Sequence, residues 1–155
     1  MRARSCFACA LLSIFRTSVF KKGTVGDKMV EVAVLDLNDP EKWNHWVIGT
    51  PEEVPRSSPF CSEQLQVRYN KNPEKEHSLQ KEVEHWHTPP IEEYYLVLRG
   101  TLRVKVEGTV IELGPMQILP VPPKKHHRVL DYSPTVEYLV IRAPISGEKT
   151  KIELG

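Results

Sequence analysis

From residue 81 to the end, the chain reads as a succession of short strands, and this feature constrains the fold more than any other. Alternating segments are separated by glycine, proline and other turn-forming residues, and they cover 81–87, 94–100, 101–108, 109–114, 116–121, 127–132 and 136–144. None of them carries a helical period over about ten residues. Short strands at this close spacing predict an antiparallel sandwich or barrel. Closure into a barrel would also remove the exposed sheet edges.

The region before residue 81 holds fewer regular elements. Residues 30–36 alternate, and residues 64–70 place Leu65, Val67 and Tyr69 on one face, so each segment predicts a strand. Residues 41–46 suit one helical turn, whereas 49–62 and 71–78 are rich in turn formers or charges and predict loops. At 155 residues, with 40% hydrophobic and 26% charged residues, the chain has the size and composition of one globular domain.

The first 28 residues differ from the rest. Their apolar stretch at 5–15 follows two arginines, as in a secretory signal, but it lacks an A-x-A-like cleavage site and falls short of the roughly 20 residues that span a bilayer. Three interpretations stay open: a dispensable leader with Met29 as the natural start, a targeting peptide, or real structure. We therefore expect residues 1–28 to be a leader or linker outside the fold, and 29–155 to be a single barrel domain. The expected location is cytoplasmic, or secreted or organelle-targeted if 1–28 is a signal.

Charge and cysteine content exclude several classes of protein. The net charge is +1, but residues 1–28 carry six basic residues and one acidic residue, which leaves 15 basic and 19 acidic residues in the body. An acidic body has no general attraction for phosphate backbones, so we expect neither a nucleic acid nor a membrane as partner. Three cysteines are too few for a disulfide framework, and we take the C-x-x-C formed by Cys6 and Cys9 as incidental.

Three groups of residues that favour metal binding stand within the predicted strands. His85 and His87 are one residue apart, so on a strand both imidazoles point to the same face. The pairs Glu92–Glu93 and His126–His127 open later strands, and because adjacent strand residues point to opposite faces, one member of each pair enters the barrel. Imidazoles with one carboxylate favour Fe, Mn, Ni, Zn or Cu over calcium and magnesium. The remaining histidines, His45 and His77, are expected in solvated loops.

Residues 85–100 resemble the first motif of the cupin superfamily, G-x5-H-x-H-x3,4-E-x6-G. The spacing from His87 favours Glu92 as the motif glutamate, whereas the spacing back from Gly100 favours Glu93, which we take as the ligand. The second motif, G-x5-P-x-G-x2-H-x3-N, is matched more loosely from Gly114 onward, with His127 in the ligand position. The chain departs from the two motifs at Leu79, Lys124 and Asp131, where the family has Gly, Gly and Asn.

The resemblance implies an all-β, antiparallel double-stranded β-helix, or jelly roll, that holds one divalent transition metal through His85, His87, Glu93 and His127. Tyr95 shares the inward parity of Glu93, and we place Tyr95, Gln117 and Tyr138 in the substrate pocket. A small cupin of this kind implies a small-molecule substrate or ligand and a homodimer.

Two functions stay open. One is a metalloenzyme that carries out dioxygenase-like oxidation, or isomerises a sugar or keto compound. The other is a non-catalytic module that binds or senses a small ligand. The body carries no attached DNA-binding domain, which favours the enzyme.

Overall fold

The computed structural model describes residues 21–25, 28–72, 83–145 and 149–151. The chain forms two compact units, Met1–Asn38 and Asp39–Gly155. In the first unit, strands β1 (Lys21–Val25) and β2 (Lys28–Val32) pair antiparallel, with Lys21 opposite Val32. Residues 21–28, which belong to the expected leader or linker, therefore contain a strand, and Met29 lies inside the next one. The start of the barrel domain at Met29 stays a prediction.

The second unit is built almost wholly from strands. It begins with a 3-10 turn, η1 (Pro40–Lys42), whose amide at Glu41 donates to the side chain of Asp39. Its strands are β3 (His45–Ile48), β4 (Gln66–Lys71), β5 (His85–His87), β6 (Glu92–Arg99), β7 (Leu102–Val106), β8 (Thr109–Leu113), β9 (Ile118–Val121), β10 (His127–Tyr132), β11 (Glu137–Ala143) and β12 (Lys149–Lys151). Among the described residues, no helix is long and apolar enough to cross a membrane.

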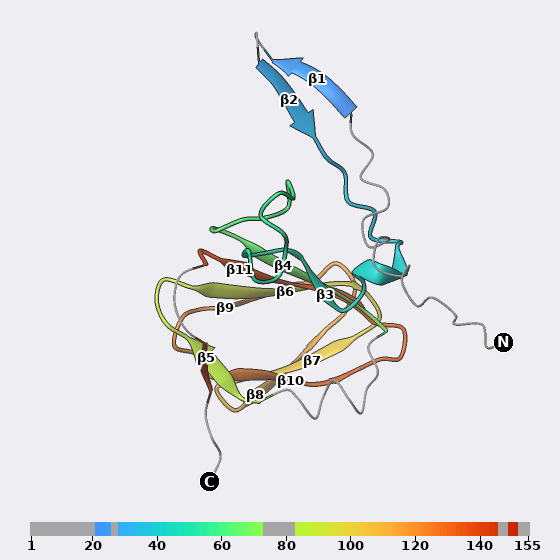
Figure 1. Cartoon of the computed structure of the whole chain (residues 1–155). Helices are drawn as coiled ribbons and strands as arrows, with labels where there is room; N and C mark the ends of the chain where they lie inside the picture. The colour runs from blue at the N-terminus through green and yellow to red at the C-terminus, as the bar shows by residue number, and fades with distance from the viewer. Residues whose placement is uncertain (1–20, 26–27, 73–82, 146–148, 152–155) are drawn as a thin grey trace, which may run out of the picture. The chain divides into compact units, whose positions relative to one another are not determined.

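These strands form two five-stranded sheets, in the orders β3-β4-β11-β6-β9 and β12-β5-β10-β7-β8. Every strand pair in them is antiparallel. Figure 1 shows the two sheets of this unit as two layers, and the chain passes repeatedly from one layer to the other. This crossing pattern is the double-stranded β-helix, so the predicted all-β jelly roll is confirmed.

The core lies between the sheets and follows the period of two that strands impose. In β6, buried Glu93, Tyr95 and Val97 alternate with more exposed neighbours. One continuous apolar cluster joins both sheets: Tyr95, Val97, Leu102, Val104, Leu113, Val121, Val129, Tyr132, Val136, Tyr138 and Val140. Full burial of a valine or leucine side chain contributes about 1.5–3 kcal/mol, so this cluster contributes strongly to the stability of the fold.

Two predicted turns owe their shape to glycine. Glu107 and Gly108 both have positive φ, 48° and 82°, and connect β7 to β8 as the two-residue hairpin turn whose twist matches the strands. Gly100 has φ 74° between β6 and β7, and a Cβ there would lie 2.9 Å from the Cα of Val136. A larger residue at position 100 would therefore push apart two core segments.

Strand β4 shows the predicted alternation, but its important face is the polar one. Val67 and Tyr69 share one face, as expected, and Leu65 stands just before the strand, while Arg68 and Asn70 on the other face line an interior cavity. His45, expected in a loop, is instead the first residue of β3, where its side chain is exposed. It is drawn into the strand because β3 pairs with β4, His45 standing opposite Tyr69. His77 lies outside the described residues.

Candidate metal centre

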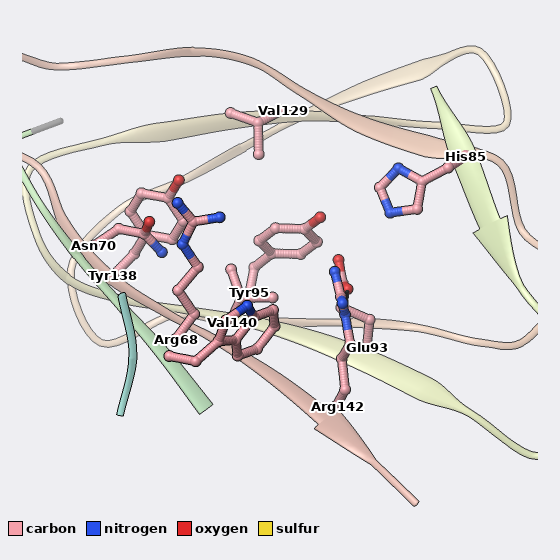
Figure 2. A pocket seen from close by; sticks show the side chains of 10 residues that line it. Arg68, Asn70, His85, Glu93, Tyr95, Val129, Tyr138, Val140 and Arg142 are labelled. Atoms are coloured by element: carbon pink, nitrogen blue, oxygen red, sulfur yellow. Dashed lines mark hydrogen bonds and ion pairs between the residues drawn. The ribbon is translucent and has the colours of Figure 1, made fainter. Parts of the chain in front are cut away.

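Three imidazoles and one carboxylate meet between the two sheets. His85 and His87 come from β5 and His127 opens β10, where it stands opposite His85 in the sheet register. Glu93 reaches the same place from β6 in the facing sheet. Figure 2 shows His85 and Glu93 directed toward each other from their two strands. All four side chains are buried, none more than 4% exposed.

The potential ligand atoms of these four residues lie close enough to hold one metal ion. One such atom from each residue lies within 4.8 Å of all the others. The ring centroids of His85 and His127 are 4.4 Å apart, and that of His87 lies 5.1 Å from the first and 5.4 Å from the second. Oxygen atoms of Glu93 lie 3.0 Å from Nε2 of His87 and 3.2 Å from Nε2 of His127. The group has the composition of a transition-metal site.

Backbone carbonyls fix two of the rings. Nδ1 of His85 lies 2.9 Å from the carbonyl of Val83, and Nδ1 of His127 lies 2.8 Å from that of Lys125. A carbonyl oxygen accepts hydrogen bonds and cannot donate them, so each Nδ1 carries the proton. In the neutral ring, Nε2 then presents a lone pair toward the centre of the cluster. This is how metal-binding histidines are usually held, one nitrogen on a carbonyl and the other on the ion.

Glu93 is charged although it is buried. Burial by itself would raise the pKa of this carboxyl, but His127 and His87, which donate to it whenever their Nε2 carries a proton, together with the positive charge of Arg142, hold the pKa well below its usual range. Nε of Arg142, on β11, donates directly to Oε2 of Glu93. The guanidinium of Arg142 in turn lies 4.9 Å from the ring centre of Trp46. The cluster therefore holds an ionised carboxylate with cationic support on one side.

The structure separates the members of both adjacent pairs. Glu93 is 1% exposed, whereas Glu92 points outward, where it accepts a hydrogen bond from the hydroxyl of Tyr94. His127 is fully buried, whereas His126 is partly exposed. These placements agree with the choice of Glu93 and His127 as the candidate ligands. They follow from strand parity, since one residue of each pair must turn away from the interior.

Lys124 occupies the position where the second motif has glycine, and it adopts the backbone conformation that glycine favours. Its φ is 65°, and its amide donates to the carbonyl of His87 at 2.9 Å. This bond ties the loop before β10 to β5. The turn before His127 therefore keeps a glycine-like shape despite the substitution, and His127 reaches the cluster.

A small cavity of about 50 Å³ adjoins the cluster, with room for a few water molecules. Tyr95 and Tyr138, which we placed in the substrate pocket, line this cavity. Gln117 does not: it is exposed, and its Oε1 accepts from the amide of Gly114 at 2.7 Å. The reason is local, because Gly114–Gln117 form the turn before β9 and the glutamine closes that turn. Figure 2 shows the lining residues around the cavity.

Four polar or aromatic lining residues were missing from the sequence prediction: Trp46, Arg68, Asn70 and Arg142. Arg68 and Asn70 alternate with the apolar residues of β4, and Arg142 follows Tyr138 and Val140 at steps of two in β11. The signal was therefore strand parity. A polar residue that points inward can be identified once it is known which face of its strand points to the interior. For β4, the sequence left this undetermined.

Comparison with known proteins finds similar folds at low sequence identity. No family model and no curated protein matches the chain. Among solved structures, a protein with a double-stranded β-helix domain from Klebsiella pneumoniae is 16% identical over 60% of this chain and 78% of its own, with a TM-score of 0.48. A cupin-2 domain protein from Shewanella frigidimarina is 21% identical over 54% and 72%, with a TM-score of 0.41. KdgF from Halomonas sp. is 15% identical over 55% and 73%, with a TM-score of 0.44.

Proposed function

We propose that this chain binds one divalent transition metal through His85, His87, Glu93 and His127 and is a metalloenzyme that acts on a small molecule in the adjoining cavity. The observation that carries the proposal is the pair of acceptors formed by His127 and Glu93. Nδ1 of His127 keeps its proton on a carbonyl, so Nε2 turns a lone pair toward a carboxylate oxygen 3.2 Å away. Two facing acceptors repel unless a cation, a metal ion or a proton, lies between them.

The donor set indicates which ions suit the site. Three imidazole nitrogens and one carboxylate favour Fe, Mn, Ni, Zn or Cu, which take nitrogen ligands, over calcium and magnesium, which take oxygen ligands. An ion of this kind supplies a Lewis acid, and iron, manganese or copper also supplies a redox centre. Four protein ligands on an ion that accepts up to about six leave room for a substrate oxygen.

The cavity residues themselves offer little acid–base chemistry. Among the lining residues described, Tyr95 and Tyr138 carry the hydroxyl groups, and Glu93 is already engaged by His87, His127 and Arg142. Orientation and electrostatic stabilisation are what these side chains can supply to a bound molecule. This favours a reaction centred on the metal, either dioxygenase-like oxidation or isomerisation of a sugar or keto compound.

One observation favours a second candidate, a metal-free module that binds a small ligand. Arg142 already supplies a cation to Glu93, so part of the charge that a metal would balance is balanced by the protein itself. In such a protein, the neutral ring of His87 would donate to Glu93 from a protonated Nε2, or His127 would carry an extra proton on Nε2 and donate it to Glu93.

Elemental analysis of the purified full-length chain separates these functions. We expect about one transition-metal ion per chain, and loss of that metal in Glu93→Gln and His127→Ala. The neighbouring variants Glu92→Gln and His126→Ala are matched controls, because both remove the same kind of group one residue away and should keep the metal. Metal content well below stoichiometric in the unmodified protein, or equal in all four variants, would contradict the proposal. Oxygen uptake and isomerisation assays on the metal-loaded protein then distinguish the two reaction classes.

A further inference from the structure

We propose that Arg68 and Asn70 form a carboxylate-binding subsite in the cavity beside the metal centre, so that the molecule bound there is a small organic acid. The inference rests on the proposed function for the role of the neighbouring metal. The subsite itself is argued from the residues of β4. This subsite indicates the chemical class of the bound molecule, which the four candidate metal-binding residues leave undetermined.

Both residues carry a buried hydrogen-bond donor that lacks an acceptor. Within the described part of the chain, Nε of Arg68 and Nδ2 of Asn70 are buried and meet no partner. Asn70 is only 4% exposed, and both residues line the cavity. A buried donor left without an acceptor costs about 1–3 kcal/mol, so native proteins rarely retain two of them side by side without a use. An acceptor within the cavity would satisfy both.

The charge of Arg68 indicates that this acceptor is an anion. Nη2 of Arg68 donates to the carbonyl of Asn44 at 3.2 Å, and no acidic side chain among the described residues forms an ion pair with the guanidinium. The carboxylate lining the cavity, Glu93, is already paired with Arg142. A partly buried guanidinium without a counter-charge selects a negatively charged ligand.

The sheet register places this subsite next to the metal centre. On β11, Arg142 stands between Gln66 of β4 and Glu93 of β6, and Val140 stands between Arg68 and Tyr95. These two rows of inward residues are two positions apart along the strands, roughly 7 Å. Figure 2 shows the side chains of Arg68 and Glu93 reaching toward the same cavity. A short molecule can therefore place its carboxylate at Arg68 and Asn70 and its other end near the metal ligands.

A carboxylate suits the subsite better than a phosphate. The planar guanidinium and the side-chain amide present N–H groups that match the two oxygens of a carboxylate, although a guanidinium also pairs with phosphate in this way. The preference comes from size, because the cavity of about 50 Å³ favours a short acid over a bulky phosphorylated compound.

Calorimetric titration of the full-length, metal-loaded protein tests this subsite. The probes are acetate and lactate, with acetamide as the neutral analogue and inorganic phosphate as the alternative anion. We expect acetate or lactate to bind, acetamide not to bind, and Arg68→Gln to weaken carboxylate binding by about tenfold or more. Asn70→Ala should weaken it less. Arg103→Gln is the matched control, because Arg103 is exposed on β7 and does not line the cavity.

Several results would overturn the inference: no binding of either acid, equal binding of acetamide, tighter binding of phosphate, or affinity unchanged in Arg68→Gln. Arg68→Lys guards against a folding defect, since it keeps the charge but loses Nε and should keep the fold with weakened binding. Metal content measured on the same samples separates this test from the proposed function. Carboxylate binding that depends on Arg68 in a protein purified without metal would support the subsite and contradict the proposed metalloenzyme function.

Discussion

The two ends of the barrel interior use the same strand geometry for different purposes. Along β7 the inward residues are apolar, and Leu102 and Val104 are completely buried. Toward β4 and the start of β6 the inward residues are polar or charged, among them Gln66, Asn70 and Glu93, each at most 9% exposed. The side chains named at both ends are buried, so burial alone does not distinguish them. What differs is whether each side chain requires a specific partner.

This difference indicates how stability and function are divided. Apolar burial is non-directional, so the apolar end tolerates small changes in geometry and holds the sheets together. A buried polar group is favourable only with its partners in place, so the polar end requires a defined ligand or ion. Strand β11 crosses the boundary, with Tyr138 and Val140 in the apolar cluster and Arg142 on Glu93. Substitutions at the two ends should therefore change different measured quantities.

The largest loss of stability is expected at the apolar end, from Leu102→Ala. The side chain of Leu102 is 0% exposed, and truncating a buried leucine leaves a cavity that costs about 2–5 kcal/mol of unfolding free energy. Urea denaturation measures the loss, and elemental analysis of the folded variant should show unchanged metal. Val110→Ala on β8, where the valine is 46% exposed, should lie within about 0.5 kcal/mol of the unmodified protein. A smaller loss of unfolding free energy for Leu102→Ala than for Val110→Ala would contradict the idea that the apolar end stabilises the fold.

At the polar end, Arg142→Gln should reveal an effect that depends on the metal. Without its guanidinium, Glu93 loses a charge-assisted hydrogen bond, which costs about 1.5–3 kcal/mol in the metal-free protein. Bound metal would supply the missing counter-charge, so the loss should shrink in the loaded protein. Denaturation with and without a chelator measures both values. An equal loss in the two states would mean that Glu93 does not contact the ion, and Arg103→Gln serves as the control.

The smallest effect is expected on the other face of β4, at Tyr69. Burial, the hydrogen bond to Glu137 at 3.0 Å and the charge of Glu137 raise the pKa of Tyr69 to about 12 from 10.0. The folded state thus keeps a proton that the unfolded chain releases, so this contribution to stability is complete below pH 10 and is lost as the pH rises toward 12. Tyr69→Phe should cost about 1 kcal/mol at neutral pH and make the decline above pH 10 less steep. Denaturation curves measured between pH 8 and 12 for both proteins test this. Equally steep losses of stability in the two proteins would mean that a group other than Tyr69 causes the decline.

The strands and the candidate ligands were accessible from the sequence because each depends on local rules. The segments around β6, β7, β8, β10 and β11 lie within one or two residues of their predicted positions, since alternation and turn residues are local signals. His85 and His87 point to the same face of their strand because of the same alternation. Strand β3 was missed because its pairing with β4 is a tertiary contact, and Gln117 was misplaced because its turn directs it away from the cavity.

The sequence by itself determined the class of fold and the chemistry of the candidate centre: alternation every two residues, turns at close spacing, and three imidazoles with a carboxylate in strand positions. Only the tertiary structure decided which residues accompany that chemistry. Arg68, Asn70 and Arg142 reach the cavity because β4 and β6 both pair with β11, and the choice of partner among strands far apart in sequence is a tertiary contact that the local patterns of these strands left undetermined.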